Sequence, residues 1–192
     1  MMKALLLNGS LKKDSDFDMI YSSIIEELKR NDFEVDSILL RDLKVAACQG
    51  DFECWLKTPG ECKIEDDGRD VAKKMVQSNL VVHFTPITFG GYSSELKKVM
   101  DRFIPNILPF FTKRNEETHH KYRYEKRSSI IAVGVLDKPN EEKESIFKEL
   151  VYRNSLNMGA PVHESIIYTK NLNKNDFINE FANIIKKVEE ST

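Results

Sequence analysis

The stretch Lys3 to Asp18, KALLLNGSLKKDSDFD, predicts how the chain begins to fold. Its apolar run ends at Asn8-Gly9-Ser10, and a helical pattern starts near Phe17. We therefore expect a first strand, a tight loop and a first helix. At such a junction, backbone N–H groups and the positive end of the helix dipole point into one small volume, which suits a phosphate.

The side chains of this loop are compatible with a phosphorylated cofactor. Ser10 and Ser15 supply hydroxyl donors, and Lys12 adds positive charge. The loop has a single glycine before Ser10, so it matches neither G-x-G-x-x-G nor the P-loop pattern, which disfavours a nicotinamide or ATP bound in those ways. The alternative interpretation is an ordinary turn in which Asp14 or Ser15 merely caps the helix.

Composition predicts one domain spanning residues 1–192. The chain has 192 residues, is 41% hydrophobic, and carries a formal net charge of -2. That charge gives no global basic footprint, so we expect no nucleic-acid and no membrane partner. Only four apolar residues follow Met1-Met2-Lys3, too few for a signal peptide, and with three cysteines this predicts a cytoplasmic protein.

Strand-like and helix-like segments alternate along the rest of the chain. This alternation predicts a doubly wound α/β domain with a parallel sheet, in which ligands bind at the carboxyl ends of the strands. After the first strand and helix, we expect strands over 35–40, 80–85, 129–136 and 161–169, and helices over 71–76, 92–103, 146–151 and 177–188. Two segments show no regular period, 48–67 and 104–127, and we expect a long loop and an irregular excursion there.

The loop after the third strand reads Pro86-Ile87-Thr88-Phe89-Gly90-Gly91. Under this topology it faces the same ligand as the Ser10 loop. Its glycines and Phe89 suit close packing of backbone against a flat aromatic ring, with N–H donors available. The two loops together favour a flavin mononucleotide over a nucleoside triphosphate.

Four segments resemble one family, the flavodoxin-like NAD(P)H-dependent FMN reductases with their iron-sulfur flavoprotein relatives. They are the loop from Asn8 to Ser15, the Pro86 to Gly91 loop, the helix from Ser94 to Arg102, and CWLKTPGEC at Cys54 to Cys62. The resemblance covers essentially the whole chain in order. It implies a three-layer α/β/α flavodoxin-like fold with a five-stranded parallel sheet in the order 2-1-3-4-5, FMN as cofactor, and NAD(P)H as co-substrate.

The loops and the resemblance together give a set of expected cofactor-binding residues. These are Ser10, Lys12, Ser15, Asp16, Phe17, Pro86, Ile87, Thr88, Phe89, Gly90, Gly91, Cys54 and Trp55. Cys54 and Trp55 are placed over the flavin or at a subunit contact, and the alternative for the cysteines is that they simply pack their loop. No catalytic acid, base or nucleophile is expected, because the cofactor supplies the chemistry.

The chain departs from the family pattern in its phosphate loop. Phe17 stands where many relatives have a small residue, and Asp14, Asp16 and Asp18 put carboxylates near the expected phosphate. Like charge there weakens phosphate binding.

A second departure concerns the cysteines. Only Cys48, Cys54 and Cys62 are present, and Asp51 stands where some relatives have a further cysteine. A cubane cluster needs four thiolates and a zinc site needs closer spacing, so we expect no metal.

The expected function is that of an FMN-dependent NAD(P)H oxidoreductase, similar to flavin and quinone reductases. Hydride passes from NAD(P)H to FMN and then to a small-molecule or protein acceptor that the sequence does not identify. A homodimer is expected, with residues 104–127 as a dimer element. The alternatives are a flavodoxin-like electron carrier, or a flavodoxin-fold interaction or sensing module that has lost FMN.

Overall fold

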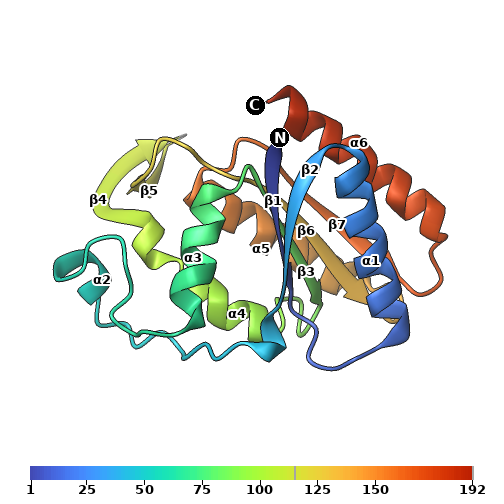
Figure 1. Ribbon diagram of the computed structural model, residues 1–192, viewed down its shortest axis with the longest axis horizontal. Helices are drawn as coiled ribbons and strands as arrows, with labels where there is room; N and C mark the ends of the chain where they lie inside the picture. The colour runs from blue at the N-terminus through green and yellow to red at the C-terminus, as the bar shows by residue number, and fades with distance from the viewer. Residues whose placement is uncertain (115, 192) are drawn as a thin grey trace.

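In this computed structural model, residues 1–114 and 116–191 are described, and they form a five-stranded parallel sheet in the order β2-β1-β3-β6-β7 (Figure 1). The sheet strands are β1 (Met2–Asn8), β2 (Phe33–Leu39), β3 (Leu80–Pro86), β6 (Ser129–Leu136) and β7 (His163–Thr169). The central strands read as continuous apolar runs because both faces of the sheet are covered. Ala4 to Leu7 of β1, for example, are at most 1% exposed.

Helices cover both faces of the sheet, which gives the expected three layers. The long helices are α1 (Ser15–Arg30), α3 (Asp67–Gln77), α4 (Ser94–Asp101), α5 (Glu141–Met158) and α6 (Lys174–Glu190). The apolar sides of α1 and α6 pack on one face, and those of α3, α4 and α5 pack on the other. The flavodoxin-like parallel arrangement is thereby confirmed. No described helix is both long enough and apolar enough to cross a bilayer.

The excursion after α4 is not irregular, and this corrects the sequence interpretation. After a short 3-10 helix (Ile104–Asn106), the strands β4 (Ile107–Arg114) and β5 (Glu117–Tyr122) form an antiparallel hairpin outside the main sheet. The register shifts between Ile107 and Phe111, around Pro109, which cannot donate a ladder hydrogen bond. Because the hairpin takes the fourth and fifth strand numbers, the expected order 2-1-3-4-5 becomes 2-1-3-6-7, with the sheet strands in the same relative positions.

The junction between β1 and α1 forms where the opening stretch predicts it. Asp14 is the N-cap of α1, and its Oδ1 accepts the N–H groups of Asp16 and Phe17 at 3.1 and 3.2 Å. Gly9 begins the loop and donates its N–H to the Phe84 carbonyl at 2.7 Å. The loop therefore runs directly beside the end of β3.

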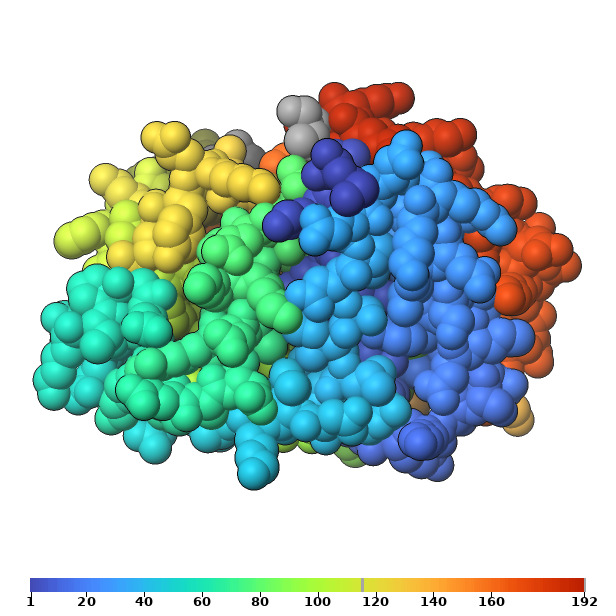
Figure 2. All heavy atoms as spheres, viewed as in Figure 1, coloured from blue at the N-terminus to red at the C-terminus, as the bar shows by residue number. Residues whose placement is uncertain are grey.

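The segment between β2 and α3 extends away from the sheet. It begins with a 3-10 turn (Leu40–Asp42) and holds the single-turn helix α2 (Glu53–Leu56). In Figure 2 the atoms around residue 55, in teal, occupy one margin of this face, next to the hairpin and far from the blue atoms of α1. Ring contacts between Trp55 and His120, with centroids 5.0 Å apart, join this segment to the hairpin.

Candidate functional site

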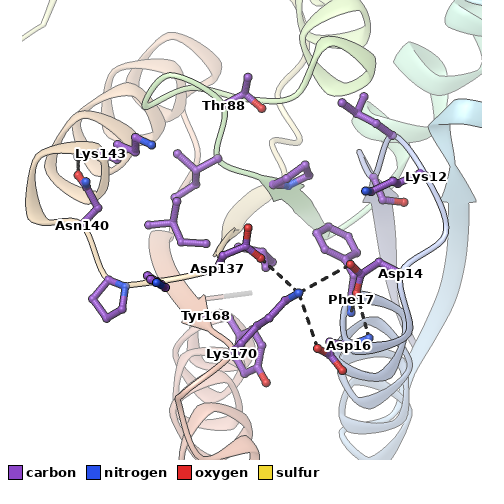
Figure 3. Close-up of a pocket in the computed structure, with 18 residues that line it drawn as sticks. Lys12, Asp14, Asp16, Phe17, Thr88, Asp137, Asn140, Lys143, Tyr168 and Lys170 are labelled. Carbon is purple, nitrogen blue, oxygen red and sulfur yellow. Dashed lines mark hydrogen bonds and ion pairs between the residues drawn. The ribbon is translucent and has the colours of Figure 1, made fainter.

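A cleft of about 770 Å³ lies at the carboxyl ends of four sheet strands. Its walls are the β1–α1 loop, the loop after β3, the β6–α5 loop and the residues that end β7 (Figure 3). Its volume is within the usual range for a small-molecule site, and its place is where doubly wound sheets bind ligands. The lining residues are Ser10, Leu11, Lys12, Asp14, Asp16, Phe17, Pro86, Ile87, Thr88, Val135, Leu136, Asp137, Lys138, Pro139, Asn140, Lys143, Tyr168 and Lys170.

The cleft brings together about half of the residues expected at a cofactor. From that set it is lined by Ser10, Lys12, Asp16, Phe17, Pro86, Ile87 and Thr88. Six other expected residues do not line it: Ser15, Phe89, Gly90, Gly91, Cys54 and Trp55. Both loops therefore face one volume, while the tip of the loop after β3 lies outside the residues that line it.

Ser10 is fixed beneath the loop. It is 3% exposed, its N–H bonds to Asn8 Oδ1 at 2.8 Å, and its hydroxyl oxygen accepts a hydrogen bond from Arg41. Arg41 comes from the 3-10 turn after β2, and no pattern in the sequence predicts its place beside Ser10. Its guanidinium brings a positive charge under the first loop.

Phe17 has a structural role at the floor of the cleft. It is 8% exposed, and its ring centroid lies 4.2 Å from that of Phe84 on β3. The ring thus packs α1 onto the sheet while one side of it lines the cleft. The departure from a small residue at this position is accommodated by packing.

The loop after β3 contains a strained turn. Thr88 and Gly91 exchange two backbone hydrogen bonds of 2.9 Å, and the residues between them have positive φ angles, 50° for Phe89 and 78° for Gly90. Phe89 is 97% exposed, so its ring does not contact the cleft. A Cβ on Gly90 would lie 2.7 Å from Ile146 Cγ2, which restricts this position to glycine. Non-glycine residues in this backbone region concentrate at functional sites.

One end of the cleft is a cluster of charges around Lys170. Lys170 Nζ lies 3.2 Å from Asp137 Oδ1, 3.8 Å from Asp16 Oδ2 and 3.9 Å from Asp14 Oδ2. Figure 3 shows the ammonium group between Asp137 on one side and the two α1 carboxylates on the other. The hydrogen bond to Asp137, with the charges of the other carboxylates, raises the pKa of Lys170.

The Asp14 carboxylate is ionised at neutral pH. Its hydrogen bond from the Phe17 N–H contributes most to lowering its pKa, and the charges of Lys170 and Lys12 act in the same direction. The carboxylate therefore holds the helix N–H donors that the sequence analysis assigned to a phosphate.

Several lining residues were not predicted from the sequence. They come from the β6–α5 loop, the start of α5, and the end of β7 with the residue after it: Asp137, Lys138, Asn140, Lys143, Tyr168 and Lys170. The rule that ligands bind at the carboxyl ends of parallel strands applies to these segments as well, and it was the signal available to find them. Asn140 has a structural task, since its side chain accepts the Lys143 N–H at 2.9 Å and caps α5.

Trp55 and Cys54 lie on α2 beside the hairpin. Trp55 Nε1 donates to the carbonyls of Ile104 and Ile107 at 3.1 and 2.9 Å, and its ring stacks on Phe52 with centroids 5.2 Å apart. Cys54 is half-buried, and burial is the main cause that raises the pKa of its thiol. Trp55 therefore joins this segment to the hairpin, and neither residue lines the cleft.

The cysteines are separate thiols. Cys48 is exposed, Cys54 and Cys62 are half-buried, and all three are free. Within residues 1–114 and 116–191, no three or more His, Cys, Asp or Glu side chains are grouped so as to hold a metal ion.

The two ends of the cleft differ in how well they fit FMN. Pro86, Ile87, Val135, Leu136 and Pro139 give apolar walls of the kind a flat ring needs, with polar side chains at the rim. The α1 end offers carboxylates, where a phosphate would need free donors. The apolar lining therefore suits the ring, and a phosphate at the α1 end meets like charge.

Comparison with known proteins gives a family match over most of the chain. The family described as NADPH-dependent FMN reductase matches residues 2–124. An iron-sulfur flavoprotein of Methanocaldococcus jannaschii is 30% identical over 109 residues, which are 57% of this chain and 55% of that protein. One from Archaeoglobus fulgidus is 35% identical over 101 residues, 53% of this chain and 48% of that protein. The matched region is thus about half the length of these curated relatives.

Solved structures share the fold at low sequence identity. An NAD(P)H:quinone oxidoreductase from Methanothermobacter marburgensis has a TM-score of 0.66 at 12% identity, covering 99% of this chain and 95% of that one. An FMN-dependent NADH-azoreductase from Bacillus anthracis, solved in complex with FMN, has a TM-score of 0.59 at 18% identity, covering 98% and 97%.

Proposed function

Since the chain belongs to the NADPH-dependent FMN reductase family, we propose that it is an FMN-dependent oxidoreductase that takes electrons from NAD(P)H. The observation that carries the proposal is the cleft at the carboxyl ends of β1, β3, β6 and β7. Its apolar walls come from two neighbouring loops, the one after β3 and the one after β6, which follow adjacent strands of the sheet. Such walls suit a flat ring that must stay accessible on one face.

In this proposal the residues of the cleft bind and orient the flavin. Pro86 and Ile87 at the end of β3, with Leu136 and Pro139 from β6 and the loop after it, give an apolar lining, and Thr88 supplies a hydroxyl at the rim. At the tip of the Thr88–Gly91 turn, the N–H groups of Phe89 and Gly90 have no acceptor among the described residues. A flavin bound in the cleft would supply the redox chemistry, as the group that takes electrons from NAD(P)H and gives them to an acceptor.

A first experiment tests flavin reduction directly. The purified protein is mixed anaerobically with excess FMN and then with NADPH or NADH, and the flavin absorption bands are followed. We expect the bands to bleach at a rate proportional to protein concentration. FMN binding without bleaching would favour an electron carrier. Absence of binding would favour an interaction or sensing module that has lost FMN. The α1 carboxylates support that alternative, because they repel a phosphate.

A paired substitution locates the binding. Thr88 is exposed at the rim, so Thr88→Trp places bulk at the cleft mouth without disturbing the core. We expect the affinity for FMN, measured by fluorescence quenching, to fall by about tenfold or more, the equivalent of about 1.4 kcal/mol. Ser22→Trp adds the same ring on the exposed side of α1 and should leave the affinity unchanged. Equal affinities for the two variants would place the flavin elsewhere.

We propose further that the protein is a homodimer through an apolar patch, defined as Phe52, Leu56, Phe110 and Phe111. These side chains are 49%, 76%, 63% and 63% exposed. Ring contacts join Phe52 to Phe111 through Trp55 and His120, with His120 and Phe111 centroids 4.7 Å apart. Several large apolar side chains exposed on neighbouring segments support an interface, because such surface is uncommon on monomers. A partner bound there would bury the hairpin.

The oligomeric state tests this directly. Phe110→Ser with Phe111→Ser should shift the protein from dimer to monomer in analytical ultracentrifugation, because both rings are lost from the patch. Met19→Ser removes an apolar side chain that is 43% exposed on α1, and it should leave the dimer intact. A wild-type protein that sediments as a monomer would exclude the proposed interface.

A further inference from the structure

We propose that the cleft recognises a flavin by its ring and ribityl chain and gains no affinity from the terminal phosphate, so that riboflavin binds at least as tightly as FMN. The inference rests on the proposed function, because it takes a flavin as the ligand. It concerns the α1 end of the cleft, where the charge cluster lies.

The first step is the fate of the helix donors. A phosphate at a helix N-terminus is normally held by the free N–H groups of the first turn. Here the Asp14 Oδ1 atom already accepts the Asp16 and Phe17 N–H groups at 3.1 and 3.2 Å. The lowered pKa of Asp14 means that this internal anion is permanent at neutral pH. A phosphate would have to displace the Asp14 carboxylate, which belongs to the chain and therefore always lies beside these N–H groups.

The second step is the charge balance. One ammonium, Lys170, stands among the three carboxylates of Asp14, Asp16 and Asp137, at 3.9, 3.8 and 3.2 Å. This corner therefore has an excess of negative charge before any ligand binds. A phosphate monoester adds about −1.5 to −2 charges at neutral pH. Lys170 could contact it only by giving up one of its carboxylate partners.

The other lysines of the cleft stand apart from this corner or at its rim. Lys12, Lys138 and Lys143 also line the cleft, so that with Lys170 four lysines face three carboxylates, but these three are exposed and come from different segments, the β1–α1 loop, the β6–α5 loop and α5. Figure 3 shows Lys12 on the α1 side and Lys143 on the opposite side, across the cleft. Spread over the rim, they attract an anion weakly and from several directions. They do not converge on one point as the ligands of a phosphate would.

The experiment compares two flavins on the intact wild-type protein. Dissociation constants for riboflavin and FMN are measured by flavin fluorescence at fixed ionic strength and neutral pH. We expect the riboflavin constant to be equal to or lower than that of FMN. FMN binding about threefold tighter or more would overturn the inference while leaving the proposed function intact. Binding of neither flavin would overturn the proposed function and the inference with it.

Charge-removing variants then test the cause. Asp14→Asn keeps a good N-cap residue while removing the charge, and Asp16→Asn removes the second α1 carboxylate. Each should tighten FMN binding by several-fold, and together by about tenfold, the equivalent of about 1.4 kcal/mol. Riboflavin affinity should change by less than about twofold. Thermal unfolding of the variants confirms that they are folded.

Asp18→Asn is the matched control. It removes the same charge from the first turn of α1, but Asp18 neither lines the cleft nor pairs with Lys170. It should improve FMN binding less than Asp16→Asn does. An equal gain from Asp18→Asn, or no gain from Asp14→Asn and Asp16→Asn, would contradict the role assigned to the cluster.

Discussion

Arg102→Leu is expected to lower the free energy of unfolding by about 3–5 kcal/mol, the range for breaking a buried ion pair by removing one partner. The Arg102 side chain is 1% exposed, and its Nη1 and Nη2 atoms each lie 2.9 Å from an oxygen of Asp66. The same guanidinium donates to the Ala46 and Ile64 carbonyls at 2.9 and 3.2 Å. Substitution would leave a half-buried carboxylate and two carbonyls without these donors.

The measurement is urea unfolding of wild type and variant. Lys97→Leu on the same helix breaks an exposed pair with Asp101, in which the side chains are 57% and 46% exposed. Exposed pairs contribute little, so this control should cost far less than Arg102→Leu. Similar losses of unfolding free energy in the two variants would contradict the role of Arg102, which is to hold the segment that precedes α3 against the end of α4.

The same ion pair predicts a dependence on pH. Burial raises the pKa of Asp66, but hydrogen bonds from Arg102 and from the Ala46 and Gly68 N–H groups outweigh it, so the net pKa is lowered. A lowered folded-state pKa stabilises the protein above the unfolded value, about 3.9, and this stabilisation is lost as the pH falls through the folded value. The difference in unfolding free energy between wild type and Arg102→Leu should therefore shrink below about pH 4.

The sequence predicted the sheet because its signals there are local and strong. The central strands are apolar runs covered on both faces, and each is followed by an amphipathic helix, so their number and parallel order follow from general rules. The hairpin was missed for the opposite reason. Its strands carry Pro109 and several charges, show no clean alternation, and pair only with each other. Their pairing depends on contacts with distant elements such as Trp55.

The site was predicted where it depends on backbone position and missed where it depends on side-chain partners. The loops after β1 and β3 end neighbouring parallel strands, so their convergence follows from topology. Which carboxylates turn toward Lys170 depends on three separate loops folding together, and no short pattern encodes that. The close approach of the start of α4 to Gly9 is another contact between distant segments that no short pattern encodes.

Gly9→Ala tests this close approach of α4. A Cβ at Gly9 would lie 2.7 Å from Ser93 Oγ, 3.0 Å from Leu96 Cβ and 3.2 Å from Thr85 Oγ1. Ser93 cannot move away easily, because its side chain caps α4 by accepting the Leu96 N–H. Overpacking of this kind costs about 1–3 kcal/mol of unfolding free energy, and loosening the cap adds to it.

Gly91→Ala is a matched control for this substitution in a neighbouring loop. Neither glycine has a positive φ, and a Cβ at Gly91 would meet its nearest neighbour, the Thr88 carbonyl oxygen, at an ordinary 3.6 Å. Urea unfolding should therefore show a clear loss for Gly9→Ala and little change for Gly91→Ala. Because Gly9 also ties the loop to the end of β3 through its N–H, its substitution should move Ser10 and weaken flavin binding as well. A Gly9→Ala protein as stable as wild type would mean that α4 can shift freely against the first loop, and the cleft would then not be held rigid by that contact.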